Sequence, residues 1–149
     1  MKSLGSVEVL SEIRTRLRSV RVDDRPRWGK MTAKKMVRHL GCAYEVALGE
    51  RVVAPVKGWP PVLAKWAALR LPMRWPKNLS TTPELKRAVA ENFDCTFDSL
   101  VDATVAKMQA VATGNRFAPT HPMFGPMTAE DWLRWGYLHA DHHLRQFGR

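Results

Sequence analysis

Apolar side chains recur at intervals of three or four residues along several stretches of the chain, which is the spacing of a helix that buries one face. The first stretch covers residues 6–20. A second begins at Thr32, whose hydroxyl is suited to an N-cap, and ends near Leu48, where Gly49 provides a stop. The inner stripes of these two predicted helices are Leu10, Ile13, Leu17 and Val20 in the first, and Met36, His39 or Leu40, Ala43 and Ala47 in the second.

The third predicted helix is the longest. Thr82 is suited to its cap and Pro83 to its first position, and Gly114 marks its end. The apolar spacing continues without interruption, so we expect one helix over residues 82–114. Its stripe is Leu85, Val89, Phe93, Phe97, Leu100, Thr104 and Met108.

The other segments are a crossover, a loop and a last helix. Residues 51–80 contain five prolines, which predicts a long crossover with a short amphipathic helix at 61–71. Residues 115–127 read as a loop. The last helix opens with Thr128 and Asp131 in the positions of a capping box and runs nearly to the end of the sequence.

No stretch alternates apolar and polar residues for long enough to indicate a sheet. The sequence therefore predicts an all-α fold, a four-helix bundle with a long crossover between helices two and three. A length of 149 residues suits a single domain over residues 1–149. The composition, 45% hydrophobic and 26% charged, is that of an ordinary globular protein.

The sequence also predicts a cytoplasmic protein with no membrane partner. Its beginning has no uninterrupted apolar run of the signal-peptide kind, and no stretch of about 18 residues lacks charge. Cys42 and Cys95 lie far apart in the sequence, and we expect both to be reduced thiols.

Basic residues are concentrated in one segment. The formal net charge is +10, and residues 13–38 hold ten basic side chains against two acidic ones. This segment either attracts an anionic substrate or polyanion, or is only a solvated face, in which case reversing Arg16 or Lys34 should alter solubility alone. Nucleic acid is not an expected partner, because no nucleic-acid-binding motif accompanies the charge.

The last helix carries the residues that point to chemistry. His139 and His143 are four residues apart, so they lie one turn apart on one helix face and can converge on a metal ion. They share that face with Trp132 and Trp135, where a histidine needs partners for both ring nitrogens. The spacing alone leaves open surface or simply hydrogen-bonded histidines.

His39 lies beside the inner stripe of a different predicted helix. Three imidazoles from two helices would make a three-coordinate site with an open position, which is typical of catalytic or substrate-binding metals rather than structural ones. We therefore predict a divalent metal site on His39, His139 and His143.

Two segments resemble the DinB-like (YfiT-type) metalloprotein superfamily. Trp28, Met31 and the run Met36-Val37-Arg38-His39-Leu40 resemble its second-helix signature. His139-x-x-x-His143-x-x-Gln146 resembles its last-helix signature, and the resemblance extends over the whole chain to a bacterial branch of the superfamily.

The resemblance implies a four-helix bundle with a long crossover between helices two and three. It also implies that zinc or nickel binds a histidine triad, which carries over to His39, His139 and His143. Relatives of this type transfer or isomerise with a low-molecular-weight thiol, such as bacillithiol, mycothiol or glutathione, bound at the metal.

Two further histidines leave alternatives open. His142 is within reach of His139 and is the alternative to His143 as a ligand, although the family pattern favours His143. His121 is either an anchor of its loop or a pocket residue.

Other neighbours can be interpreted in two ways. Cys42 is either a buried thiol or a soft ligand, and Asp141 or Gln146 either orients an imidazole or lies exposed. Three tryptophans of the crossover either line a pocket mouth or serve in packing: Trp59, Trp66 and Trp75.

The predicted site supports three functions. In a thiol-dependent S-transferase, the metal-bound thiol loses its proton and attacks an electrophile, and Arg38 binds a carboxylate of the thiol. In a hydrolase, the metal activates water, with Asp141 or Glu130 as the candidate base. The third candidate function is that of a non-catalytic, stress-related module that binds a metal or another ligand. The expected partner is a small-molecule thiol or electrophile, and the sequence is also compatible with a homodimer.

Overall fold

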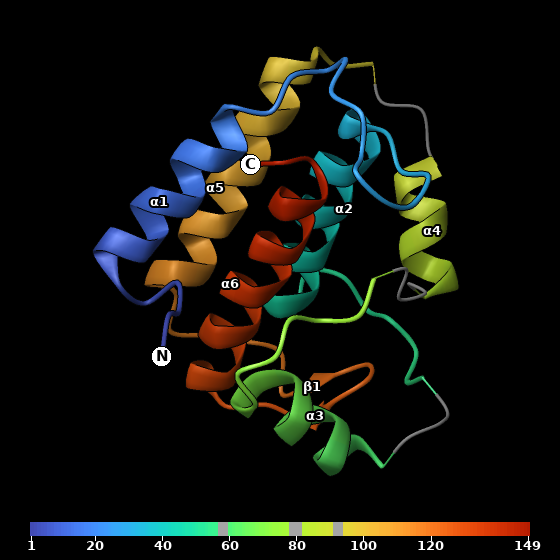
Figure 1. Ribbon diagram of the computed structural model, residues 1–149. Coiled ribbons are helices and arrows are strands. Elements are labelled where there is room, and N and C mark those ends of the chain that lie inside the picture. The colour runs from blue at the N-terminus through green and yellow to red at the C-terminus, as the bar shows by residue number, and fades with distance from the viewer. Residues whose placement is uncertain (57–59, 78–81, 91–93) are drawn as a thin grey trace.

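The computed structural model describes residues 1–56, 60–77, 82–90 and 94–149. The described chain is all-α apart from one short β-hairpin, as predicted (Figure 1). The elements in chain order are α1 (Val7–Arg18), α2 (Ala33–Ala47), α3 (Pro61–Arg70), α4 (Pro83–Ala90), α5 (Phe97–Thr113), β1 (Thr120–His121), β2 (Gly125–Pro126) and α6 (Ala129–Gln146).

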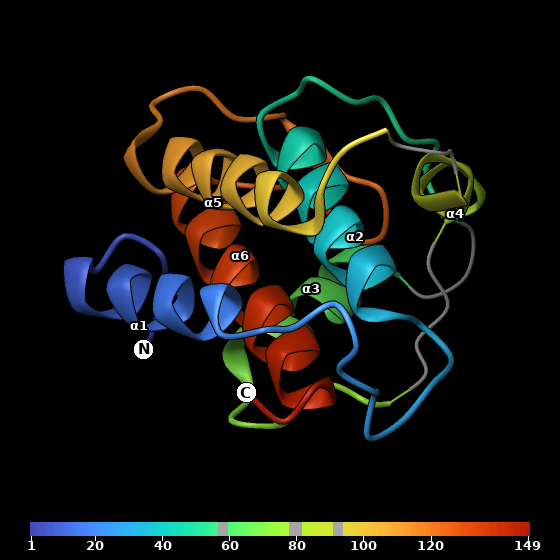
Figure 2. The same ribbon diagram turned by 90° about the horizontal axis from the view of Figure 1, so that it is seen from above.

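The four longest helices lie side by side around one core. α2 packs against α5 and α6, and α1 packs against the same two helices from the other side, while α4 lies outside against α2 (Figure 2). The predicted stripes are the faces that meet, because Ile13 and Leu17 of α1 and Met36 and Leu40 of α2 are fully buried. The helix faces that carry the candidate histidines therefore point inward.

Side-chain caps fix where the main helices begin. The Thr32 hydroxyl accepts a hydrogen bond from the amide of Lys35 at the start of α2. Thr128 and Asp131 form the predicted capping box of α6, in which each side chain accepts a hydrogen bond from the other residue's backbone amide. These caps fix the first turns of the two helices that carry the histidines.

The prediction of a single helix over residues 82–114 is wrong. α4 ends at Ala90 and α5 begins at Phe97. Thr96 is the N-cap of α5, and its hydroxyl accepts a hydrogen bond from the amide of Ser99 at 3.2 Å. Phe93, placed in the predicted stripe, lies outside the described residues. The apolar spacing continues through the break because both helices pack against α2.

The crossover contains the predicted short helix, α3, which packs against α6 and β2. Lys65 and Arg70 of α3 form ion pairs with Asp131 at 3.1 and 3.3 Å. Its amphipathic character is weak, because Val62, Leu63 and Trp66 are exposed. None of the helices in the described part of the chain has the length and apolar character needed to cross a bilayer.

Candidate metal centre

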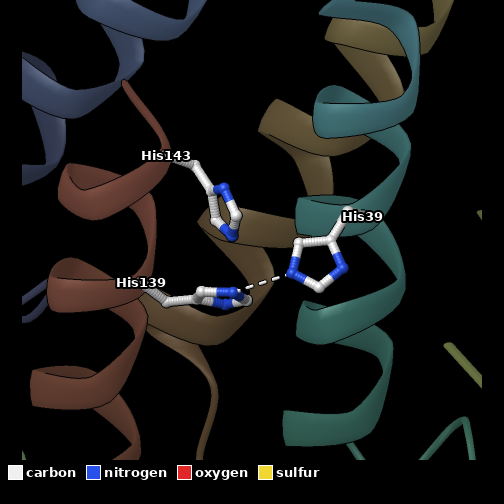
Figure 3. Close-up of side chains that lie close together, drawn as sticks. All are labelled: His39, His139 and His143. Atoms are coloured by element: carbon white, nitrogen blue, oxygen red, sulfur yellow. Dashed lines mark hydrogen bonds between the residues drawn. The ribbon is translucent and has the colours of Figure 1, made fainter. Parts of the chain in front are cut away.

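Three histidines meet between α2 and α6. His39 comes from the middle of α2, and His139 and His143 come from successive turns of α6, so all three rings enter the same space (Figure 3). Nε2 of His39 lies 3.0 Å from Nε2 of His139. The centroid of the His143 ring lies 4.7 Å from the centroid of the His39 ring and 4.9 Å from that of the His139 ring.

These three residues can offer one nitrogen each within 4.8 Å of one another. In the described part of the chain, no cysteine or carboxylate joins the group. Neutral imidazole nitrogens at such distances are suited to a divalent transition metal, and three of them leave a coordination position open.

Burial keeps the three rings neutral. Loss of solvent lowers the pKa of His39 to about 4, and the neighbouring charge of His142 acts in the same direction. Burial and then the other histidines hold the pKa of His139 well below 6.5, and burial does the same for His143. Neutral imidazole is the form that binds metal, so burial keeps these three side chains in the form that a metal site requires.

A short relay fixes the orientation of His143. The amide nitrogen of Gln146 donates to the carbonyl of Trp28 at 2.8 Å, so its Oε1 is left to accept from Nδ1 of His143 at 3.0 Å. The proton of His143 is therefore on Nδ1, and the lone pair of Nε2 faces the other two rings.

The other two rings lack such a partner. Nδ1 of His39 and Nδ1 of His139 are buried with no hydrogen-bond partner among the described residues. The close Nε2 contact lets one ring donate to the other, yet two imidazoles facing each other through Nε2 are also the arrangement that a shared ion would bridge. The donor set and its burial thus fit a divalent metal.

A sequence model of the DinB superfamily matches residues 10–147. The chain belongs to the DinB superfamily. The matched range includes all three histidines and Gln146. Searches of curated proteins and of solved structures gave no match.

In this DinB-superfamily protein the ring of His142 lies 5.2 Å from the ring of His143. Its ring lies 5.9 Å from the ring of Trp28 and 6.2 Å from that of Trp75, and it is outside the group of three. Trp75 also lies 6.1 Å from His139, so of the two crossover tryptophans that the structure describes it is the one placed beside the histidines. Trp66 is exposed, and Trp59 lies outside the described residues.

His121 is the loop anchor rather than a member of the site. Its Nδ1 accepts from the amides of Met123 and Phe124 at 3.1 and 3.3 Å, and its ring stacks on Phe124. Burial lowers its pKa to about 3. The two short strands are built around this turn, with Gly125 at a φ of 65° that side chains disfavour.

The remaining candidates are occupied by other contacts or lie apart from the triad. Asp141 pairs with Arg16 at 2.9 Å and Arg145 at 2.8 Å, so Gln146, not Asp141, contacts an imidazole of the triad. Arg38 lies 3.7 Å from Glu45. Cys42 is buried but outside the three-histidine group, and Glu130 is exposed in the first turn of α6.

Sequence reasoning did not find the part played by Trp28, whose backbone carbonyl holds Gln146. No side-chain pattern signals a backbone acceptor. The one available signal was Gln146 itself, three residues after His143 and thus on the same helix face.

Proposed function

We propose that this protein binds one divalent metal ion, zinc or nickel, through Nε2 of His39, His139 and His143. The observation that carries the proposal is the convergence of three buried imidazoles from two helices within 4.8 Å. The fold that presents them is then a single domain, 1–149, with α1, α2, α5 and α6 as a four-helix bundle and α3 and α4 in the crossover.

The protein's own residues supply most of what such a site needs. Packing of α2 against α6 sets the separation of the imidazoles, burial keeps them unprotonated, and Gln146 holds the proton of His143 away from the centre. A bound ion would supply Lewis acidity and lower the pKa of a thiol at its open position.

A thiol-dependent S-transferase is the activity we infer for this site. Three nitrogen ligands leave room for one soft donor, and a soft sulfur competes well with water on zinc, nickel or cobalt. Of the two carboxylates considered as the base of a hydrolase, Asp141 is engaged by two arginines and Glu130 is exposed.

Metal analysis tests the site directly. Protein purified without added metal should contain close to one zinc or nickel ion per chain by elemental analysis, and His39→Ala, His139→Ala and His143→Ala should each lose it. His142→Ala is the matched control and should keep the ion. Retention in His143→Ala together with loss in His142→Ala would show that the neighbouring histidine is the ligand.

Thiol binding tests the activity. Cobalt-substituted protein should develop a sulfur-to-metal charge-transfer band with a small thiol, and Cys42→Ser should retain the band, since Cys42 is not the donor. Absence of a response to bacillithiol, mycothiol, glutathione and cysteine at millimolar concentration would contradict the S-transferase. A band without transfer to any electrophile would instead assign a metal- and ligand-binding module.

A further inference from the structure

A groove of about 250 Å³ lies between α6 and the segment 71–75, which follows α3. The α6 side of the groove is formed by side chains that recur at the spacing of one helix face: Arg134, Tyr137, Leu138 and Asp141. The volume is below the roughly 300 Å³ at which pockets for drug-sized ligands begin, so the groove suits a smaller molecule.

Two hydrogen bonds to the end of α3 hold the opposite wall in place. Nε of Arg134 donates to the carbonyl of Leu69 at 3.3 Å, and Nε1 of Trp75 donates to the carbonyl of Ala68 at 2.9 Å. The ring of Trp75 also lies 6.1 Å from the ring of His139. A single indole therefore touches both the groove and the candidate metal centre.

Apolar and aromatic side chains make up much of the lining. Leu71, Met73 and Trp75 contribute to it from the segment, and Tyr137 and Leu138 contribute from α6. Met73 is 61% exposed. Aromatic rings and a flexible thioether offer adaptable contact surface, and a ligand with an apolar body would remove this surface from water.

Most of the charged groups in the lining are engaged by other residues. Asp141 pairs with Arg145 at 2.8 Å, and Lys2 pairs with Glu12 at 2.7 Å. Nη1 of Arg134 donates to the backbone carbonyl of Lys2 at 2.6 Å. These contacts hold the side chains in the fold rather than leaving them to meet a ligand.

Arg74 is the exception among the charged groups of the groove. It is exposed, and no ion pair or hydrogen bond joins it to another residue in the part of the chain that the structure describes. A guanidinium presents its N–H donors in a planar fork that matches the two oxygens of a carboxylate. Arg74 stands between Met73 and Trp75, so this cation is placed next to the apolar lining.

We infer that this groove binds a small amphipathic carboxylate, with the acid group on Arg74 and the apolar body against Met73 and Leu138. The site is separate from the proposed metal centre, and its occupation does not require a metal. It adds a second ligand to the one that the open metal position would take.

The test compares two molecules that share a phenylpropyl body and differ in the acid group, 3-phenylpropionate and 3-phenyl-1-propanol. Each is titrated into the protein, and the NMR signal of the Trp75 indole N–H is the readout, since Trp75 lines the groove. Both should shift this signal, and the acid should bind about fivefold more tightly, as one partly exposed ion pair would give. Absence of a shift with either molecule at millimolar concentration would overturn the inference.

Two variants separate the acid contact from the apolar contact. Arg74→Gln should bring the ratio of the two affinities to near one and leave the affinity for the alcohol unchanged. Met73→Ala should weaken both molecules alike, by about threefold, because it removes apolar surface only. A ratio that stays fivefold in Arg74→Gln would overturn the assignment of the acid group.

The matched control is Lys77→Gln. Lys77 is exposed three residues after Arg74 and lies over the ring of Trp28, at 5.0 Å from its centroid, rather than in the lining. The control removes the same charge and should keep the fivefold preference. An equal fall in Lys77→Gln and Arg74→Gln would show that net charge, not the groove, selects the acid.

A variant of the metal centre keeps the two proposals distinct. His39→Ala should lose the ion and still bind 3-phenylpropionate with the affinity of the wild type. If the wild type itself holds no metal, the same titration tests the groove alone. A loss of 3-phenylpropionate binding in His39→Ala would overturn the inference that the groove is a separate site.

Discussion

The three histidines are held in different ways. His143 has its second nitrogen fixed by Gln146, which is itself fixed by the carbonyl of Trp28, whereas Nδ1 of His39 and of His139 has no partner among the described residues. A hydrogen bond to the second nitrogen sets the tautomer and makes the ligating nitrogen more basic. Of the three proposed ligands, His143 is therefore the one whose geometry depends most on a single neighbouring side chain.

Replacing Gln146 by alanine should weaken metal affinity by about 10- to 100-fold, because His143 would be free to rotate and to change tautomer. Zinc competition against a chelator measures this. Asp141→Asn is the control, since Asp141 contacts arginines rather than the triad. Equal losses in the two variants would mean that Gln146 acts only through general stability.

His121 makes stability depend on pH. Its pKa is about 3 in the fold against 6.5 for a free histidine, so below pH 6.5 the unfolded chain takes up a proton that the folded chain does not. Stability should therefore fall as pH drops from about 6.5 toward 3, by up to about 1.4 kcal/mol per pH unit for this group.

The variant His121→Asn isolates the contribution of His121 to the pH dependence of stability. The asparagine oxygen can replace Nδ1 as acceptor for the amides of Met123 and Phe124 but does not titrate. Denaturant unfolding of metal-free protein at several pH values should give a shallower slope for the variant. The same slope as wild type would show that His121 is not a source of the acid sensitivity.

At the scale of elements, the break between α4 and α5 allows α4 to pack against α2. Because residues 94–96 are not helical and α5 begins at Phe97, α4 does not have to continue the line of α5 and lies against the outer side of α2. A continuous helix would place residues 83–90 in line with α5 instead.

The sign of the stability change on replacing Thr96 by alanine tests the break between α4 and α5. As an N-cap of α5, Thr96 should cost about 1 kcal/mol of stability when changed to alanine, whereas inside a continuous helix the same change would be stabilising. Thermal unfolding measures it. Thr113→Ala, in the last turn of α5, is the control and should not destabilise by a comparable amount.

The sequence predicted α1, α2, α3 and α6 because each combines an apolar stripe or compact apolar run with a cap or proline at its start. The sequence also predicted that the three histidines lie close together, because their spacing puts them on the inward faces of α2 and α6. The break escaped prediction because the spacing from Leu85 to Phe97 and beyond continues through it. The only local sign was Thr96, with Ser99 three residues later, and an isolated threonine is a weak signal against a long periodic pattern.

At the scale of the molecule, part of the basic segment at residues 13–38 is neutralised by acidic residues outside that segment. Arg16 pairs with Glu12 and Asp141 and donates to the backbone carbonyl of Arg149, and Arg18 pairs with Asp102. The expectation that Arg16 affects only solubility therefore needs correction, because its guanidinium joins α1 to the end of α6.

Arg16→Glu should lower stability by about 1–2 kcal/mol, since the new carboxylate would face Glu12 and Asp141. For a chain of this size that corresponds to a fall in Tm of roughly 2–4 °C per kcal/mol. Arg14 is exposed on the same helix, so Arg14→Glu makes the same change of charge and should leave Tm nearly unchanged. Equal effects would assign the loss to overall charge.

The histidines that meet at the centre come from distant parts of the chain, since His139 is 100 positions after His39. An ion held by both would close a loop of that length, as a covalent bond does, and for a disulfide such closure is worth about 4.7 kcal/mol in the loop-entropy model. The ion would thus be a removable cross-link. While it stays bound, α2 and α6 cannot separate, so its residence time would set how slowly the loaded protein unfolds.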